Sequence, residues 1–134
     1  MSPYKTTDQL YTCAGALFER IQIQNPKASQ SVSNARLLIQ LRCFDPAGEI
    51  IINGRQRPLI TSFGPISQRP DLLIELSSFT LHQILLGELL LPKALGNGSL
   101  KVTGPVFKAL VLAELFLQGQ SLYPTILREQ GLYK

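Results

Sequence analysis

The stretch GNGSLKVTGPVFKALVLAELFL, residues 96–117, decides how the rest of the chain is interpreted. Its first three residues, Gly-Asn-Gly, suit a tight turn because glycine takes positive φ at little steric cost. Residues 99–103 then alternate polar and apolar side chains, which is the period of a half-buried strand. Gly104 interrupts this strand, and Pro105 stands where the first residue of a helix would lack an amide partner in any case. The stretch therefore predicts a turn, a strand and a helix.

The helix predicted over residues 106–117 is apolar almost all round. Lys108 and Glu114 are its only charged residues, and it has no other polar side chain. A surface helix has one polar face, so a helix of this composition is buried or lies against another apolar body. Three surroundings fit: a crowded core, a partner protein, or a cavity that holds a hydrophobic ligand.

Length and composition indicate one domain, residues 1–134, with an ordinary hydrophobic fraction of 45% and a low charged fraction of 16%. The net charge of +4 comes from scattered basic residues, whereas a nucleic-acid binder usually has a concentrated basic face. We therefore expect no nucleic-acid partner. Arg55 and Arg57, with Arg69 nearby, form the one hint of a basic cluster. We interpret it as a solvated loop, and the alternative is a site for phosphate or lipid headgroups.

The sequence contains no segment of about 18 consecutive apolar residues, the length needed for a transmembrane helix. The first eight residues are polar, so no signal peptide is predicted and we expect a cytoplasmic location. Cys13 and Cys43 are too few for a disulfide framework and lack metal-ligand spacing. We interpret both as small buried hydrophobic residues rather than as a redox pair.

Hydrophobic periodicity predicts the remaining elements, and their order is that of an α+β domain. A first helix begins at a cap formed by Thr7 or Asp8 and runs to about residue 22. Residues 25–33 are expected to be a loop. A later helix, which Thr80 and Gln83 would cap, continues towards Gly87. The predicted strands cover residues 35–44, 49–53, 58–63 and 71–77. A short turn at 92–95, a break at 118–120 and a final helix at 121–130 complete the chain.

A search for catalytic chemistry finds no recognisable pattern. His82 is the one histidine, and we interpret it as a surface or packing residue, with a general base as the weaker alternative. The glycines match neither a dinucleotide fingerprint nor a phosphate loop, and no serine occupies a nucleophile elbow. We therefore expect no enzyme activity, no metal and no cofactor.

Residues 71–117 resemble the second half of the sterol carrier protein family, the non-specific lipid-transfer fold. The matching pieces are the strand 71–77, the helix that ends at Gly87, the sequence Pro-Lys-Ala-Leu at 92–95, and the strand between Gly98 and Gly104. Residues 1–70 fit the family only in the order of their elements. Two features depart from it: Pro105 stands where a polar residue is more usual, and the chain continues past the usual end.

The resemblance implies a single-domain, bacterial-type member with a five-stranded, mostly antiparallel sheet that helices cover, enclosing an apolar tunnel. It implies non-catalytic binding and transfer of a sterol, fatty acid, fatty acyl-CoA or isoprenoid lipid. The alternative is an interaction or accessory module of a lipid- or quinone-modifying complex. The expected partner is a lipid or another apolar small molecule, and transient membrane contact or a protein partner stays open. The residues expected to line the tunnel are Phe79, Leu85, Leu89, Phe107, Leu110, Leu115 and Phe116.

Overall fold

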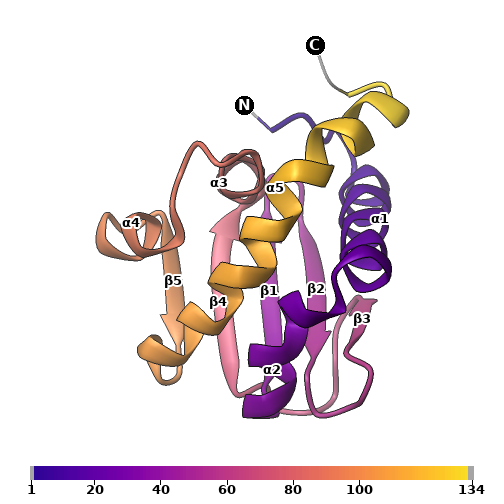
Figure 1. Ribbon diagram of the computed structural model, residues 1–134. Helices are drawn as coiled ribbons and strands as arrows, with labels where there is room; N and C mark the ends of the chain where they lie inside the picture. The colour runs from indigo at the N-terminus through magenta and orange to yellow at the C-terminus, as the bar shows by residue number, and fades with distance from the viewer. Residues whose placement is uncertain (1, 133–134) are drawn as a thin grey trace.

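The computed structural model describes residues 2–132 and consists of a five-stranded sheet with helices packed on one of its faces (Figure 1). This is the α+β arrangement that the sequence predicts. The helical elements are α1 (Thr7–Gln24), the 3-10 helix η1 (Pro26–Ser29), α2 (Gln30–Ala35), α3 (Ser78–Leu86), α4 (Leu91–Gly96), the 3-10 helix η2 (Val106–Val111) and α5 (Leu112–Glu129). The strands are β1 (Leu38–Phe44), β2 (Gly48–Asn53), β3 (Ile60–Phe63), β4 (Leu72–Ser77) and β5 (Leu100–Thr103).

The strands lie in the order β3-β2-β1-β4-β5, and all neighbours except β1 and β4 run antiparallel. The sheet is thus five-stranded and mostly antiparallel, as the resemblance implies. In the one parallel pair, Ile39 of β1 lies beside Leu72 of β4, and Leu41 lies beside Ile74. These apolar residues point to the helical face, and they place the core between the middle of the sheet and the helices.

The core is built from residues that alternate along the strands and recur at helical spacing along α1 and α5. Ile39, Leu41 and Cys43 supply the β1 side. The helices add a larger set of buried residues: Leu10, Cys13, Leu17, Phe18 and Ile21 from α1, and Leu112, Leu115, Phe116, Tyr123, Ile126 and Leu127 from α5.

Both cysteines are free and buried, as predicted. Burial raises the pKa of the Cys13 thiol to about 11. It raises the pKa of Cys43 to about 12, although a hydrogen bond with Ser78 acts in the other direction. Both side chains are therefore neutral thiols that pack as small hydrophobic groups.

The opposite face of the sheet also buries apolar residues. Leu38 and Ile51 are 1% and 2% exposed, although they lie outside the main core. The connection from β3 to β4 begins at Gly64, whose N–H donates to the carbonyl of Glu49, and ends at Asp71, whose N–H donates to the carbonyl of Leu38. It therefore runs across β2 and β1. Because the helices occupy the other face, we infer that this connection covers Leu38 and Ile51.

The structure differs from the sequence-based prediction at residues 25–33 and at the N-terminal cap of α3. Residues 25–33 form η1 and most of α2 rather than a loop. They bury only Ala28, Ser29 and Val32, which is too few residues to show a helical period. The cap of α3 is Ser77 rather than Thr80, because the Ser77 hydroxyl accepts the N–H of Thr80.

The predicted break at 118–120 is also wrong, because α5 continues through it. Gly119 is buried, and a Cβ at this position would lie 3.4 Å from the side chain of Leu17 in α1. The glycine therefore belongs to a close contact between two helices instead of ending one. Residues 106–111, predicted as the first half of an α-helix, form the tighter 3-10 helix η2.

Asp71 joins the beginnings of β4 and β1. The Leu38 N–H donates to Asp71 Oδ2 at 2.8 Å, and Arg55 Nη2 donates to both carboxylate oxygens at 3.0 Å. Partial burial acts to raise the pKa of Asp71, but the Leu38 N–H, Arg55 and Lys108 together hold it below its usual value. The ionised carboxylate therefore stabilises the fold.

We expect Asp71→Asn to lower the free energy of unfolding by about 1 kcal/mol at neutral pH, because the hydrogen bonds to a charged acceptor are lost in a site that water partly screens. The folded-state pKa lies below the unfolded value of about 3.9, so this contribution is present above that pH and disappears as the pH falls through the folded pKa. Urea unfolding at several pH values measures it. Glu75→Gln on β4 is the control, and an Asp71→Asn loss of stability that persisted in strong acid would contradict the assignment.

Candidate functional site

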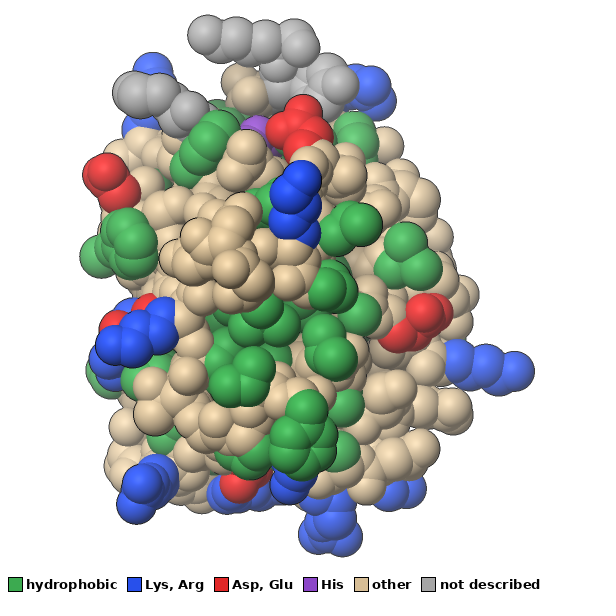
Figure 2. Space-filling view, turned by 90° about the vertical axis from the view of Figure 1, so that its left-hand side faces the viewer, with side chains coloured by type: hydrophobic (Ala, Val, Ile, Leu, Met, Phe, Trp, Pro, Cys, Tyr) green, Lys and Arg blue, Asp and Glu red, His purple; other side chains and the backbone are tan. Residues whose placement is uncertain are grey.

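A continuous set of apolar side chains lies where α4, β5, η2 and the first turns of α5 meet. Figure 2 shows these hydrophobic side chains gathered in the middle of that side of the molecule. We call this surface the apolar face. Its exposed members are Leu90, Val106, Phe107, Leu110 and Leu117. Leu89, Leu95, Val102 and Val111 are partly buried members that pack against the core.

The geometry of η2 explains why this segment turns large side chains outward. A 3-10 helix has three residues per turn, so residues i and i+3 share a side. Ala109 and Leu112 share the buried side, whereas Phe107 and Leu110 share the exposed side, with 72% and 45% of their surface accessible. Ala109 is the one buried residue of η2 itself. The segment therefore rests on the core through the small buried side chain of Ala109 and the partly buried side chain of Val111.

Gly104 sets the direction in which the chain leaves β5. Its φ is +119°, and a Cβ there would lie 2.5 Å from the carbonyl oxygen of Asp71. A side chain at this position would be strained and would also collide with the backbone of Asp71, just before β4. The glycine thus fixes the turn from β5 into η2 and so the position of Phe107.

The seven predicted wall residues fall into three groups. Leu85, Leu115 and Phe116 are buried in the main core. Phe79 and Leu89 are partly buried. Phe107 and Leu110 are exposed on the apolar face, which differs from the enclosed position expected for them. That these residues line a ligand cavity stays a prediction.

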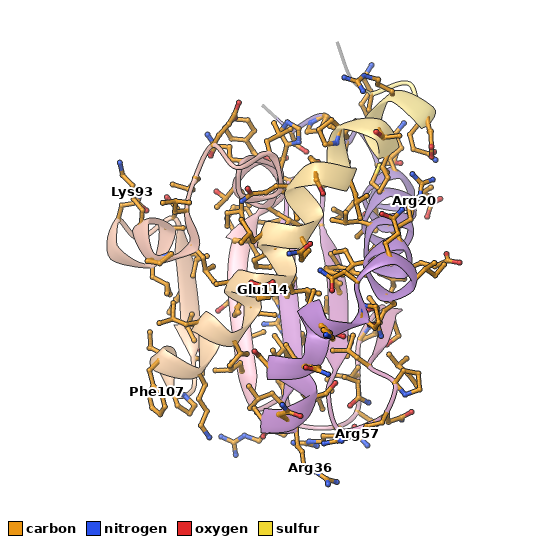
Figure 3. The ribbon with its side chains drawn as sticks, viewed as in Figure 1. Arg20, Arg36, Arg57, Lys93, Phe107 and Glu114 are labelled. Carbon is orange, nitrogen blue, oxygen red and sulfur yellow. The ribbon has the colours of Figure 1, made fainter. Side chains whose placement is uncertain are left out.

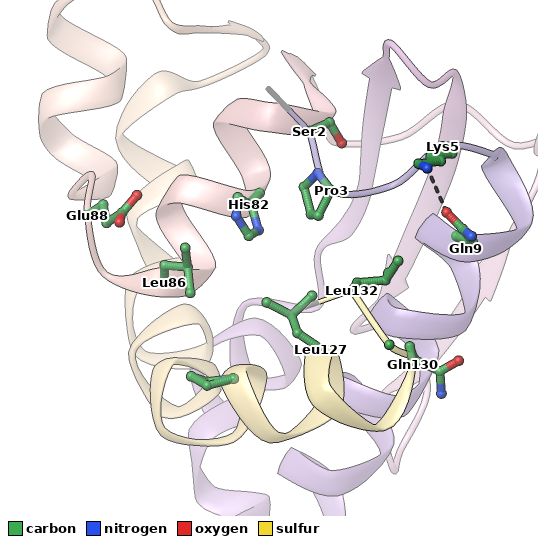
Figure 4. Close-up of a pocket in the computed structure, with 12 residues that line it drawn as sticks. Ser2, Pro3, Lys5, Gln9, His82, Leu86, Glu88, Leu127, Gln130 and Leu132 are labelled. Atoms are coloured by element: carbon green, nitrogen blue, oxygen red, sulfur yellow. Dashed lines mark hydrogen bonds between the residues drawn. The ribbon is translucent and has the colours of Figure 1, made fainter. Parts of the chain in front are cut away.

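A pocket of about 930 Å³ lies where Ser2 and Leu132, the two ends of the described residues, come together (Figure 4). The N-terminal segment, the end of α3 and the end of α5 surround it. Pro3, Leu86 and Leu132 supply apolar lining, and His82 and Lys5 supply polar lining. We call it the terminal pocket. A second pocket of about 650 Å³ lies between α1 and β3.

Behind the terminal pocket, His82 is hydrogen-bonded to two buried tyrosines. Its Nδ1 lies 2.6 Å from the hydroxyl of Tyr123, which in turn is hydrogen-bonded to the hydroxyl of Tyr4. Tyr4 and Tyr123 are 3% and 0% exposed. Burial raises the pKa of each phenol well above its usual value, so both stay protonated. Burial lowers the pKa of His82, with Glu88 acting in the opposite direction.

The directions of these hydrogen bonds follow from a count of donors and acceptors. Among residues 2–132, the Tyr4 hydroxyl has no hydrogen-bond partner other than Tyr123. It therefore donates to Tyr123, and Tyr123 donates to Nδ1 of His82. The neutral imidazole then carries its proton on Nε2. A protonated ring would need to donate from Nδ1 and would leave a buried phenol proton without an acceptor.

Sequence reasoning interpreted His82 as a surface or packing residue and did not identify its two hydrogen-bonded tyrosines. Tyr4 and Tyr123 are 119 positions apart in the chain, and no local pattern connects them. It also did not predict that Leu90, Val106 and Leu117 would be exposed. The three consecutive leucines at 89–91 were a signal for the exposure of Leu90. Consecutive side chains in a short connection point in different directions, so all three cannot face the core.

Comparisons with solved structures assign the fold. The sterol carrier protein domain 2 of Helicoverpa armigera superposes with a TM-score of 0.67 at 18% sequence identity, over 90% of this chain and 95% of that chain. Palmitated SCP2L2 from Aedes aegypti superposes with a TM-score of 0.61 at 20% identity, over 79% of this chain and 92% of that chain. The chain has the sterol carrier protein fold, as the resemblance of residues 71–117 indicates.

Two further structures carry the same fold in other settings. The ubiquinone synthesis protein UbiJ-SCP2 superposes with a TM-score of 0.55 at 13% identity, over 79% of this chain and 84% of that chain. In the sec-alkylsulfatase Pisa1 from Pseudomonas sp. (TM-score 0.52, 24% identity), the match covers 67% of this chain but only 14% of the enzyme. No protein-family model and no curated protein matches the sequence.

Two searches of residues 2–132 gave negative results. None of their helices combines the length and the apolar character needed to cross a membrane. Within the same residues, no three histidine, cysteine or acidic side chains are grouped in a way that could hold a metal ion.

We expect His82 to titrate below its usual pKa of about 6.5 and to hold its proton on Nε2. Because the unfolded chain takes up this proton at a higher pH than the folded protein, stability should fall as the pH drops below about 6.5. As the one histidine of the chain, His82 gives unambiguous ¹⁵N imidazole signals.

Two comparisons check this assignment. His82→Gln should lose the corresponding part of the pH dependence of unfolding. An imidazole that titrates at or above 6.5, or that carries its proton on Nδ1, would show that the directions of the hydrogen bonds are wrong.

Proposed function

We propose that the protein binds a hydrophobic ligand at the apolar face and transfers it without changing it chemically. The observation that carries this proposal is the apolar face itself, five exposed large hydrophobic residues in contact with a layer of partly buried ones. Monomeric proteins rarely expose apolar patches larger than a few hundred Å² unless the patch binds something. The fold supports a lipid as the ligand, since one protein that shares it was solved in a palmitated state.

A route from the apolar face into the core follows from the weak attachment of η2. Ala109 is the one buried residue of this segment and Val111 is partly buried, and η2 leads directly into the beginning of α5, where Leu115 and Phe116 belong to the core. Moving η2 outward would therefore cost little buried surface and would open a path between β5 and α5. We propose that an acyl or isoprenoid chain enters there, with each buried methylene contributing about 0.8 kcal/mol.

The proposal assigns no catalytic role to any residue. His82 is oriented by Tyr123 and Tyr4 in the terminal pocket, which the β-sheet register places at the opposite end of the sheet from η2. The cytoplasmic location expected from the sequence stays part of the proposal. A sterol, fatty acid, fatty acyl-CoA and isoprenoid lipid remain the candidate ligands.

A second candidate is an accessory module of a lipid- or quinone-modifying complex. The same exposed face favours it, because five large hydrophobic residues could equally be covered by a protein. The similarity to UbiJ-SCP2, a ubiquinone synthesis protein, supports this alternative. In that case the purified protein would carry no lipid.

We expect Leu117→Asp to weaken palmitate binding about tenfold, the loss that corresponds to roughly 1.4 kcal/mol of apolar contact. Leu117 is 55% exposed, so the substitution should not unfold the domain. Isothermal titration calorimetry measures the affinity. Ile23→Asp is the matched control, because Ile23 is 73% exposed on α1 and lies outside the apolar face. This variant should bind palmitate with unchanged affinity.

Organic extraction of the purified protein followed by mass spectrometry provides the direct test. The carrier proposal predicts a long-chain apolar molecule in part of the population. It is wrong if nothing apolar is extracted and the protein binds neither palmitate, palmitoyl-CoA, cholesterol nor a long-chain quinone. The accessory module would then be the better account.

A further inference from the structure

The geometry points to a membrane-docking surface at the end of the molecule where η2 lies, with an anionic lipid bilayer as the partner. Val106 and Phe107 would enter the interface, and Arg36, Arg57, Arg69 and Lys108 would contact lipid headgroups. We call these residues the docking end. This inference goes beyond ligand binding, and vesicle binding can be measured whether or not a ligand is bound.

The register of the sheet brings the segments of the docking end together. Leu38 pairs with Asn53, Ile39 with Leu72, and Leu73 with Thr103, so the beginnings of β1 and β4 and the ends of β2 and β5 share one edge. The residues that leave the strands at this edge are Arg36, the loop 54–59, Arg69 with Asp71, and residues 104–108. Figure 3 shows Arg36, Arg57 and Phe107 at this end of the molecule.

Side-chain contacts support the same grouping. Arg55 forms an ion pair with Asp71, and Lys108 is close enough to help lower the pKa of that carboxyl group, as the hydrogen bond from Leu38 also does. The η2 segment that carries Phe107 therefore lies beside the arginine-containing loop. The apolar and basic parts of the docking end form one surface.

The charge of this end is unbalanced. These segments contain one acidic residue, Asp71, and five basic residues: Arg36, Arg55, Arg57, Arg69 and Lys108. The local excess is four positive charges, which equals the formal net charge of the whole chain. Within residues 2–132, Arg36, Arg57 and Arg69 form no ion pair. They are exposed and available to an anionic surface.

The apolar part of the docking end decides the kind of anionic partner. Phe107 is 72% exposed and its neighbour Val106 is 50% exposed, and Figure 3 shows Phe107 at a lower corner of the molecule. Exposed aromatic and aliphatic side chains surrounded by cations match a bilayer, whose headgroups are anionic and whose interior is apolar. A nucleic acid would match the charges but would leave Val106 and Phe107 in water.

Docking in this way would place the apolar face against the bilayer. Leu110 and Leu117 follow Phe107 along η2 and α5, so a lipid chain that leaves the bilayer would meet continuous apolar contact. The basic residues would hold the protein in the orientation in which η2, the weakly anchored segment, faces the membrane.

The experiment measures sedimentation of the full chain with vesicles of phosphatidylcholine, with and without phosphatidylglycerol. We expect binding only to the anionic vesicles, and weaker binding at high salt. Arg57→Gln and Arg69→Gln should each weaken binding about fivefold. Lys5→Gln, which removes an exposed charge at the opposite end, should have no effect.

Insertion of the apolar part can be followed separately, because the chain contains no tryptophan. In the Phe107→Trp variant, the tryptophan emission should shift to the blue with anionic vesicles. Ile23→Trp is the matched control, since Ile23 is 73% exposed on α1 and should stay in water.

Three outcomes would overturn the docking proposal: no binding to anionic vesicles, equal binding to both vesicle types, or an emission shift at Ile23→Trp but none at Phe107→Trp. A protein that binds palmitate but not vesicles would overturn docking alone. A protein that binds vesicles but no apolar ligand would overturn only the carrier function.

Discussion

The structure depends on the pairing of two strands that are distant in the sequence, β1 and β4, which lie parallel in the middle of the sheet. Asp71 fixes the beginning of this pair. Its backbone N–H donates to Leu38, and its carboxylate accepts the Leu38 N–H, so one residue holds the other strand by both of its polar groups. The register that results sets which residues face the helices. It also determines that β5 begins beside the end of β4, and therefore where η2 and the apolar face lie.

The strands could be predicted from the sequence because their environment is periodic. Ile39, Leu41 and Cys43 alternate with the polar residues Gln40 and Arg42 through the middle of β1, between Leu38 and Phe44 at its two ends. Gly119 shows the limit of such reasoning. A glycine between polar residues favours a break, yet this one is buried against Leu17, a residue more than a hundred positions earlier in the chain. Local patterns do not contain contacts of that kind.

The candidate site could be predicted in position but not in orientation. Apolar composition drew attention to residues 106–117, where Leu115 and Phe116 are buried in the core, and their place in a ligand cavity stays a prediction. Composition does not show which side of such a segment faces the core, however. Phe107 and Leu110, three residues apart on η2, lie on its exposed side. The hydrogen bonds between His82, Tyr123 and Tyr4 depend on contacts across the whole chain and have no local signal.

The terminal pocket has a consequence for how this domain can be joined to other proteins. Ser2 and Leu132 both line it, so the two ends of the described chain meet at one place. The hydrogen bond between Tyr4 and Tyr123 holds the segments that lead to them. Phe107 of η2, Arg36 and Arg57 lie at the other end of the sheet, away from this junction (Figure 3). A linker attached at either end would act as a tether at the rear of the domain, and the opposite surface would stay free to meet its partner.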